Sequence, residues 1–210
     1  MRGTAAAGTP MRLARHHLLI AAVVVIATAA CGQVSIDCAR SKLLVHASKS
    51  GLFSGLANNL DNLEVEAPIA EGTVDEVAQR VNLVIDSRNM KVVDPQLPAD
   101  KRRQVQERIL GPKVLDSERY PRIMFESTKV QQVGQGKFLV RGRLFLRGVT
   151  RLISVSLRRE NAQYVGTSTL RQSEFGIRPI TIAGGTVKVK DELQIEFDIR
   201  PSANAAGTGS

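Results

Sequence analysis

Tryptophan is absent from this 210-residue chain, and the other aromatic residues are only two tyrosines and six phenylalanines. Proteins that bind nucleic acid usually combine clustered cations with aromatic side chains on which bases stack. The formal net charge is +9, but lysine and arginine are interleaved with acidic residues over most of the chain. We therefore expect no nucleic-acid partner, and an anionic membrane surface suits the positive surplus better.

Histidine is also scarce, because the chain contains only His16, His17 and His46. We expect the first two to leave with an N-terminal signal, so a single histidine remains for a zinc site that needs several ligands. A Ser-His-Asp triad has no Gly-x-Ser-x-Gly motif to supply its serine. We predict no metal, no cofactor and no catalytic residue. An enzyme that uses Asp116 and Glu118 on lipid phosphates is the enzymatic alternative.

Cysteine occurs twice, as Cys31 and Cys38, and the chain has no Cys-x-x-Cys motif. The spacing argues against redox and metal chemistry. In an oxidising compartment the two thiols can form a disulfide. If Cys31 is acylated instead, Cys38 is a single thiol close to the first strand. The sequence leaves both alternatives open.

Long apolar runs are missing, apart from one between Leu18 and Ala27. Arg2, Arg12 and Arg15 precede this run and small residues follow it, which is the three-part pattern of a secretory signal. A membrane-spanning helix takes about 20 apolar residues, so a retained anchor is only the alternative. We predict that residues 1–30 are a cleaved signal peptide and that the protein is exported to the periplasm or cell envelope.

The end of the signal allows two mature forms. Ala27-Thr28-Ala29 fits the small-x-small rule for ordinary cleavage. The stretch from Thr28 to Cys31 also resembles a lipobox, in which the cysteine is acylated and becomes the new N-terminus. Each buried CH₂ group of an acyl chain contributes about 0.8 kcal/mol to anchoring. Cys31 is therefore the lipidation candidate, and both the free and the lipid-anchored forms remain open.

The mature chain is predicted to form one domain. Loss of the first thirty residues removes three arginines and no acids, which leaves 26 basic and 20 acidic residues and a net charge of +6. No repeat or Gly- and Pro-rich linker divides residues 33–200, and they are numerous enough to bury their own core. Residues 201–210 are small and polar, and we predict that this tail is disordered.

Alternation of apolar and polar residues predicts strands that each bury one face. The clearest row is Leu193, Ile195, Phe197 and Ile199. Other rows lie at residues 43–47, 81–85, 123–125, 138–146, 153–157 and 164–170. One short surface helix is expected over Pro98–Leu110. The pattern predicts an all-β protein, an antiparallel barrel or sandwich, and of these we favour the barrel.

Several motifs resemble the signatures of a known family. Val114–Thr128 places an acidic-basic pair before Tyr-Pro and an alternating strand that ends in Ser-Thr. Gly142–Arg151 and Ser173–Ile177 resemble the second and third signatures, and Ser35-Ile36-Asp37 fits the family's opening. On these residues the chain resembles the YceI-like family over nearly the whole mature domain.

The resemblance implies an extended, lipocalin-like antiparallel barrel of about eight strands. It also implies a bound isoprenoid chain, either a polyprenyl phosphate or an isoprenoid quinone, held for transport, storage or sequestration. An eight-stranded barrel is wide enough to hold one small ligand. The chain departs from the family at Arg147 and at Asn58 and Asn59, where relatives carry histidines, so a metal role of those histidines is not carried over.

The apolar residues expected to line the barrel and contact the lipid are Phe53, Leu56, Phe125, Phe138, Val140, Leu144, Leu146, Phe175 and Ile177. The small residues expected to leave room inside are Ala47, Gly142, Gly166 and Ser168. Arg141, Arg143 and Arg147 are candidates for contact with an anionic head group, although we favour a solvated outer face as their explanation. The alternative function is a structural or interaction module whose barrel is filled by its own side chains. The sequence does not predict the oligomeric state.

Overall fold

The computed structural model describes residues 32–50, 62–179, 181–182 and 187–202. The predicted signal, Cys31, Phe53, Leu56, Asn58 and Asn59 lie outside these ranges, as does most of the predicted tail. The described part is mostly strand, with one α-helix and two short 3₁₀ helices.

The strands are β1 (Gln33–Ser35), β2 (Lys42–Ser50), β3 (Asn62–Glu66), β4 (Ile69–Asp75), β5 (Arg80–Asp86), β6 (Lys91–Val92), β7 (Arg122–Gly134), β8 (Lys137–Leu146), β9 (Val149–Glu160), β10 (Gln163–Arg171), β11 (Thr181–Ile182) and β12 (Val187–Ile199). The helices are η1 (Ser87–Asn89), α1 (Ala99–Leu110) and η2 (Gln172–Phe175).

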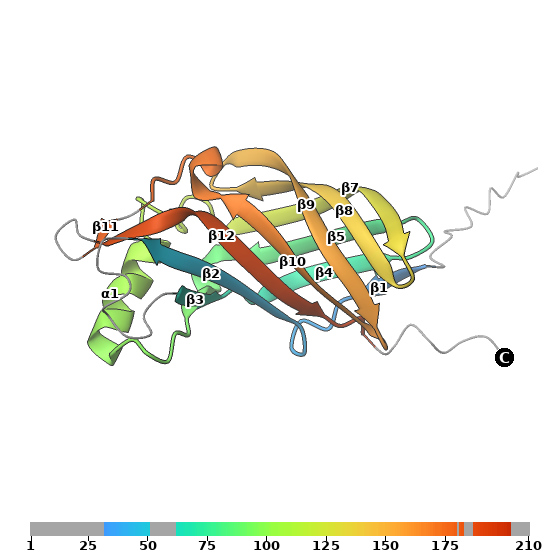
Figure 1. The fold of residues 1–210 in the computed structure, drawn as a ribbon, viewed down its shortest axis with the longest axis horizontal. Coiled ribbons are helices and arrows are strands. Elements are labelled where there is room, and N and C mark those ends of the chain that lie inside the picture. The colour runs from blue at the N-terminus through green and yellow to red at the C-terminus, as the bar shows by residue number, and fades with distance from the viewer. Residues whose placement is uncertain (1–31, 51–61, 180, 183–186, 203–210) are drawn as a thin grey trace, which may run out of the picture. The chain divides into compact units, whose positions relative to one another are not determined.

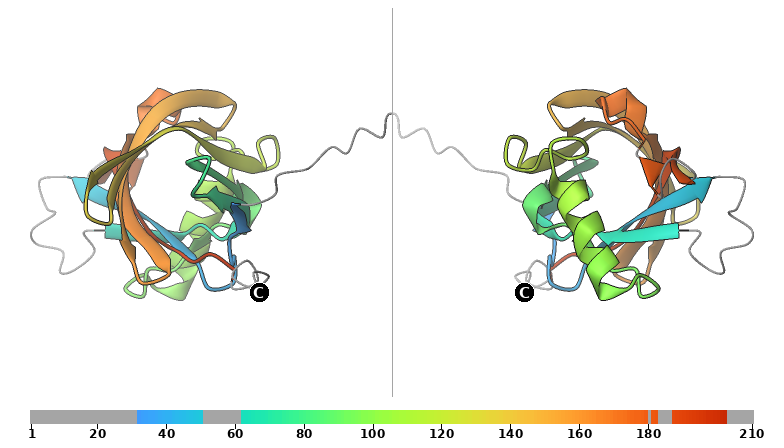
Figure 2. Two further views of the ribbon diagram at one scale, coloured as in Figure 1. Left: turned by 90° about the vertical axis from the view of Figure 1, so that its right-hand side faces the viewer. Right: turned by 90° about the vertical axis from the view of Figure 1, so that its left-hand side faces the viewer.

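One antiparallel sheet contains all twelve strands of the described residues, in the order β1-β4-β5-β7-β8-β9-β10-β12-β2-β3-β6, with β11 beside β12. The sheet curls around a central axis (Figures 1 and 2). The predicted all-β antiparallel fold is therefore confirmed. The strands are more numerous than the predicted eight, because four pieces of two to five residues (β1, β3, β6 and β11) accompany the eight long strands.

The curled sheet closes near β1, where the segment around β1 contacts the segment that follows β12. The residues of β1 pair with β4, and Gln33 lies opposite Asp75. Beyond β1, the Asp37 N–H donates to the Arg200 carbonyl at 2.8 Å, and the Ser202 N–H donates to the Ser35 carbonyl at 2.8 Å. These bonds join the segment after β12 to the segment around β1, so backbone groups at this edge are satisfied within the fold.

The chain enters β1 directly against the turn between β4 and β5. A Cβ atom at Gly32 would lie 2.9 Å from the Asp75 carboxylate and 3.2 Å from the Val77 Cβ. The φ angle of Gly32 is +157°, a value that L side chains rarely adopt. The first described residue is thus packed onto the β4–β5 turn.

The predicted helix begins one residue later than expected, at Ala99, and ends at Leu110 as predicted. Val105 and Ile109 pack against the core of the barrel, and the rest of the helix is mostly exposed. The Gln106 side chain accepts from the Val92 N–H and donates to the Met90 carbonyl, both at 2.8 Å. α1 is thereby held across one end of the curled sheet (Figure 2, right).

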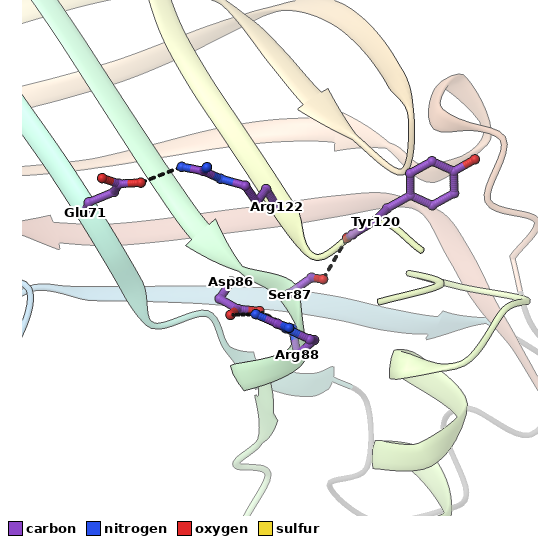
Figure 3. A network of polar contacts seen from close by, with 6 residues as sticks. All are labelled: Glu71, Asp86, Ser87, Arg88, Tyr120 and Arg122. Carbon is purple, nitrogen blue, oxygen red and sulfur yellow. Dashed lines mark hydrogen bonds and ion pairs between the residues drawn. The ribbon is translucent and has the colours of Figure 1, made fainter. Parts of the chain in front are cut away.

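The Tyr-Pro segment of the first motif is fixed to η1 (Figure 3). The Ser87 hydroxyl donates to the Tyr120 carbonyl at 2.9 Å, and the Ser87 N–H donates to the Pro121 carbonyl at 2.8 Å. Ser87 can be 1% exposed because both of its donors are satisfied. This part of the motif therefore has a structural role, since it fixes the start of β7 beside the end of β5.

Candidate functional site

The inward rows of the long strands surround a cavity of about 360 Å³. Every long strand contributes to its wall, and most of the contributing side chains are aliphatic or phenylalanine. Known ligand pockets have volumes of roughly 300–1,000 Å³, so the cavity is of ligand-binding size. The barrel is hollow where the described residues surround it, rather than filled by its own side chains.

Most of the predicted lining residues lie on this wall: Phe125, Phe138, Val140, Leu144, Leu146 and Ile177. Phe175 is fully buried, but it packs within the core and not on the wall. Phe53 and Leu56 fall in a segment outside the described residues. The alternating rows of β7 and β8 position the first five of these side chains, because residues two apart share a face.

Two of the small residues do not leave the predicted room. A Cβ atom at Gly142 would lie 2.5 Å from the Phe125 ring, and one at Gly166 would lie 2.6 Å from the Phe197 ring. Each glycine is therefore covered by an aromatic ring from the neighbouring strand, an arrangement that also stabilises glycine in sheets. The prediction that Gly142 and Gly166 open the interior is wrong, whereas Ala47 and Ser168 do line the cavity.

The cavity is apolar at the end that α1 covers. Ile109 of the helix and Val114 and Leu115 of the following segment contribute to the wall there. Two polar lining residues, Ser168 and Gln172, are already engaged, because Ser168 donates to the Ser154 carbonyl at 2.9 Å and Gln172 donates to the Lys190 carbonyl at 2.8 Å. This end offers a ligand mainly hydrocarbon contact.

The opposite end of the cavity is polar. The lining residues that form this polar end are Asp75, Glu76, Gln79, Arg80, Arg159 and Tyr164. The first four belong to the end of β4, the β4–β5 turn and the start of β5, and the last two belong to the β9–β10 hairpin. Both hairpins lie at the end of the sheet away from α1 (Figure 1).

Glu76 joins these two hairpins across the polar end. Its carboxylate accepts a hydrogen bond from the Tyr164 hydroxyl and lies 3.3 Å from the Arg159 guanidinium. The Arg159 guanidinium also lies 6.0 Å from the centroid of the Tyr164 ring. Burial, and then the hydrogen bond to Glu76, raise the pKa of Tyr164 to about 12. The phenol is therefore neutral at any physiological pH and acts as a hydrogen-bond donor.

The polar end was not among the predicted site residues, although part of it had a visible signal in the sequence. Arg159 continues the inward row of Ile153, Val155 and Leu157, two residues beyond its last apolar member. Tyr164 likewise opens the inward row of β10. A polar residue at the end of an inward row marks the mouth of a barrel. Glu76 had no such signal, because it lies in a turn.

The three candidate head-group arginines lie away from the cavity wall. Arg141 and Arg143 are exposed on the outer face, where Arg143 pairs with Glu126 at 2.9 Å. Arg147 has a φ of +50° and donates to the Gly176 and Pro112 carbonyls at 3.0 and 2.9 Å. Its guanidinium therefore ties together two loops.

The remaining candidates for chemistry also lie outside the cavity. Asp116 and Glu118 are in the turns before β7, and the Asp116 carbonyl accepts from the Tyr120 N–H at 2.8 Å. His46 faces outward, 3.5 Å from Glu196 and 3.8 Å from Glu64. Within the described ranges, no three His, Cys, Asp or Glu side chains are grouped so that they could hold a metal ion.

The Cys38 thiol donates to the Ile36 carbonyl at 3.6 Å, and burial raises its pKa. Its predicted partner Cys31 lies outside the described residues, so the disulfide and the acylated form both stay predictions. None of the helices in the described part of the chain combines the length and the apolar character that a membrane crossing requires.

Comparisons with known proteins agree with this geometry. The model of the YceI-like domain family matches residues 35–200. UPF0312 protein VPA0850 of Vibrio parahaemolyticus is 31% identical over 123 residues, which cover 54% of this chain and 64% of that protein. UPF0312 protein VVA0736 of Vibrio vulnificus is 27% identical over 129 residues, 57% of this chain and 62% of that protein. The matched region thus spans less than two thirds of the length of these relatives.

A solved structure shares the fold. The crystal structure of Burkholderia cenocepacia BcnA superposes with a TM-score of 0.53 at 19% sequence identity, and the match covers 78% of this chain and 98% of that one. The predicted resemblance is confirmed, because the family match covers most of the chain and includes all three motifs. This chain belongs to the YceI-like family.

Proposed function

We propose that this protein binds an isoprenoid lipid, with the hydrocarbon chain in the apolar part of the cavity and the head group at the polar end. The observation that carries the proposal is the cavity of about 360 Å³ with an almost wholly apolar wall. An apolar void of this kind stays dry and accepts an apolar ligand. Each Å² of ligand surface removed from water contributes about 25 cal/mol.

Transport, storage or sequestration fits this site better than catalysis. The carboxylates nominated for the enzymatic alternative, Asp116 and Glu118, lie in turns outside the cavity. Of the two carboxylates on the cavity wall, Asp75 accepts from the Ala78 N–H and Glu76 accepts from Tyr164. The same cavity also argues against a structural module, because a barrel filled by its own side chains would leave no such space. The resemblance to the family implies an isoprenoid as the ligand class, with polyprenyl phosphates and isoprenoid quinones as the two candidates.

We further propose that the protein works outside the cytoplasmic membrane, as a periplasmic or lipid-anchored envelope protein. The basic, apolar and small-residue pattern of residues 1–30 supports export, and Cys31 supports acylation. A mature net charge of +6 favours contact with anionic membrane surfaces, from which an isoprenoid would be taken up.

The test is extraction of the purified native protein with organic solvent, followed by mass spectrometry of the extract. We expect an isoprenoid lipid in a molar amount close to that of the protein. Delipidated protein should then take up an isoprenoid quinone or a polyprenyl phosphate from detergent solution. A protein that emerges free of lipid and binds neither compound would contradict the proposal, and lipid hydrolysis products in the second assay would point to the enzymatic alternative.

A further inference from the structure

The polar end of the cavity is balanced in charge. It contains two carboxylates, Asp75 and Glu76, and two guanidinium groups, Arg80 and Arg159. The other described lining residues are apolar or uncharged, so no other charged side chain reaches the cavity from the described part of the chain. A phosphate or diphosphate head group would bring up to three negative charges to a region without net positive charge.

Glu76 already binds the donors that an anionic head group would contact at the polar end. Its carboxylate already accepts from the Tyr164 hydroxyl and pairs with Arg159 at 3.3 Å. A phosphate that approached these donors would have to displace the carboxylate and remain beside it. The side chains of Glu76 and Arg159 are about half exposed, at 53% and 49%, so the phosphate and the carboxylate would repel each other in a region that is partly open to water and to salt.

An uncharged head group avoids this repulsion. A carbonyl or hydroxyl oxygen can accept a hydrogen bond from donors such as Gln79 and Arg80 without the separation of the Glu76–Arg159 ion pair. Desolvation of a neutral oxygen also costs far less than desolvation of a phosphate. The balance of charges therefore discriminates between the two ligand classes that the fold alone leaves open.

We propose that Glu76 makes the cavity selective for isoprenoids with an uncharged, oxygen-bearing head group, such as a quinone or an isoprenoid alcohol, and against isoprenoid phosphates. The selectivity rests on the proposed function, because it assumes that an isoprenoid occupies the cavity. Arg159 and Tyr164 act as positioning residues that hold the Glu76 carboxylate at the polar end.

Two probes with the same chain isolate the effect of the head group: geranylgeraniol and geranylgeranyl diphosphate. Binding of each is measured by competition against a fluorescent fatty-chain probe in the delipidated full-length mature protein. The wild type should prefer the alcohol by at least about tenfold. Glu76→Gln, which keeps a hydrogen-bond acceptor for Tyr164, should abolish most of this preference by strengthening diphosphate binding, with the alcohol almost unchanged.

Glu160→Gln is the matched control. Glu160 pairs with Arg158 on the same β9–β10 hairpin and is not on the cavity wall, so its removal changes the net charge equally. Glu160→Gln should leave the preference for the alcohol over the diphosphate intact. Higher ionic strength should weaken the preference of the wild type, because salt screens the repulsion. Circular dichroism of each variant checks that the strand content is unchanged.

The outcomes separate the two proposals. If both probes bind the wild type equally, or if Glu76→Gln and Glu160→Gln shift the preference alike, the selectivity of Glu76 is wrong while lipid binding stands. If neither probe nor a quinone binds, the proposed function fails and the selectivity fails with it. Tyr164→Phe provides a second variant, and a loss of selectivity there with retained alcohol binding would support the positioning role.

Discussion

Tyr164 is a residue whose ionisation is open to direct measurement. Burial and the neighbouring Glu76 carboxylate raise its pKa from the ordinary 10 to about 12. The folded state therefore favours the neutral phenol, so the corresponding stability is complete below pH 10 and is lost as the pH rises from 10 through 12. Because Tyr164 contacts Glu76, that loss should begin with separation of the β4–β5 and β9–β10 hairpins.

The chain has no tryptophan and only two tyrosines, so Tyr120→Phe leaves Tyr164 as the only tyrosine. In this variant, the ultraviolet absorbance of the phenolate should titrate with a midpoint well above pH 10. Addition of Glu76→Gln should lower the midpoint, since the negative charge beside the hydroxyl is then gone. A midpoint near the ordinary value in Tyr120→Phe would refute the contact with Glu76.

A second single-residue prediction concerns Gly142 and the stability of the folded state. A methyl group there would lie 2.5 Å from the Phe125 ring and 2.6 Å from the Glu126 carbonyl oxygen. Gly142→Ala should therefore lower the free energy of unfolding by about 1–3 kcal/mol through overpacking. Gly134→Ala is the control, since its nearest side-chain atom would be 3.7 Å away. Urea denaturation followed by circular dichroism measures both, and equal stabilities would show that the ring moves freely.

Single residues were predictable from the sequence only where an alternating row fixed their direction. The rows placed Phe138, Val140 and Leu144 inward correctly. The same rule did not reveal that Phe125 covers Gly142, because this contact depends on a β-bulge between Ser127 and Lys129 and on the side-chain rotamer. Glu76 meets Tyr164 across 88 positions of sequence, and no local pattern encodes such a contact.

At the scale of one element, β9 offers a paired test of the cavity. Val155 lines the cavity, and Ser156, the next residue, is exposed on the outer face. Val155→Trp should fill part of the cavity and lower the affinity for isoprenoid by about fivefold to a hundredfold, if overpacking costs about 1–3 kcal/mol. Ser156→Trp should bind like the wild type. Uptake by the delipidated variants is compared by mass spectrometry, and equal loading of both would place the lipid elsewhere.

Each substitution also introduces the only tryptophan of the chain. Its fluorescence should be blue-shifted in Val155→Trp and close to that of water-exposed indole in Ser156→Trp. This difference verifies the direction of each side chain independently of binding.

Seven of the eight long strands were predictable, and the short ones were not; the long strand β4, with the sequence IAEGTVD, shows no alternating row. β12 and β9 alternate over many residues, so their period is visible. β1, β6 and β11 have only two or three residues, which is too few for a period to be seen. They become strands because a neighbouring strand offers its hydrogen bonds, and this is a property of the tertiary structure. The helix was predictable because Val105 and Ile109 share a face and Gly111-Pro112 follows.

For the whole molecule, the decisive prediction concerns Cys31. If the cysteine is acylated, Cys31→Ala should abolish incorporation of radiolabelled palmitate and should move the protein from the membrane fraction to the soluble periplasmic fraction. Cys38→Ala is the control and should keep both label and anchoring. Absence of label from the unmutated protein would leave the free periplasmic form, and a mobility shift on reduction would then reveal a disulfide between the two cysteines.

The packing of Gly32 onto the β4–β5 turn also bears on which end of a lipid-anchored barrel would lie near the membrane. An acylated Cys31 would be tethered one Cα spacing, about 3.8 Å, from Gly32, and Gly32 borders Asp75 and Val77 at the polar end. The tether would then keep this end of the barrel, with Val77, which is 78% exposed, close to the bilayer surface. An isoprenoid could then pass between the membrane leaflet and the cavity without exposure of its hydrocarbon chain to water.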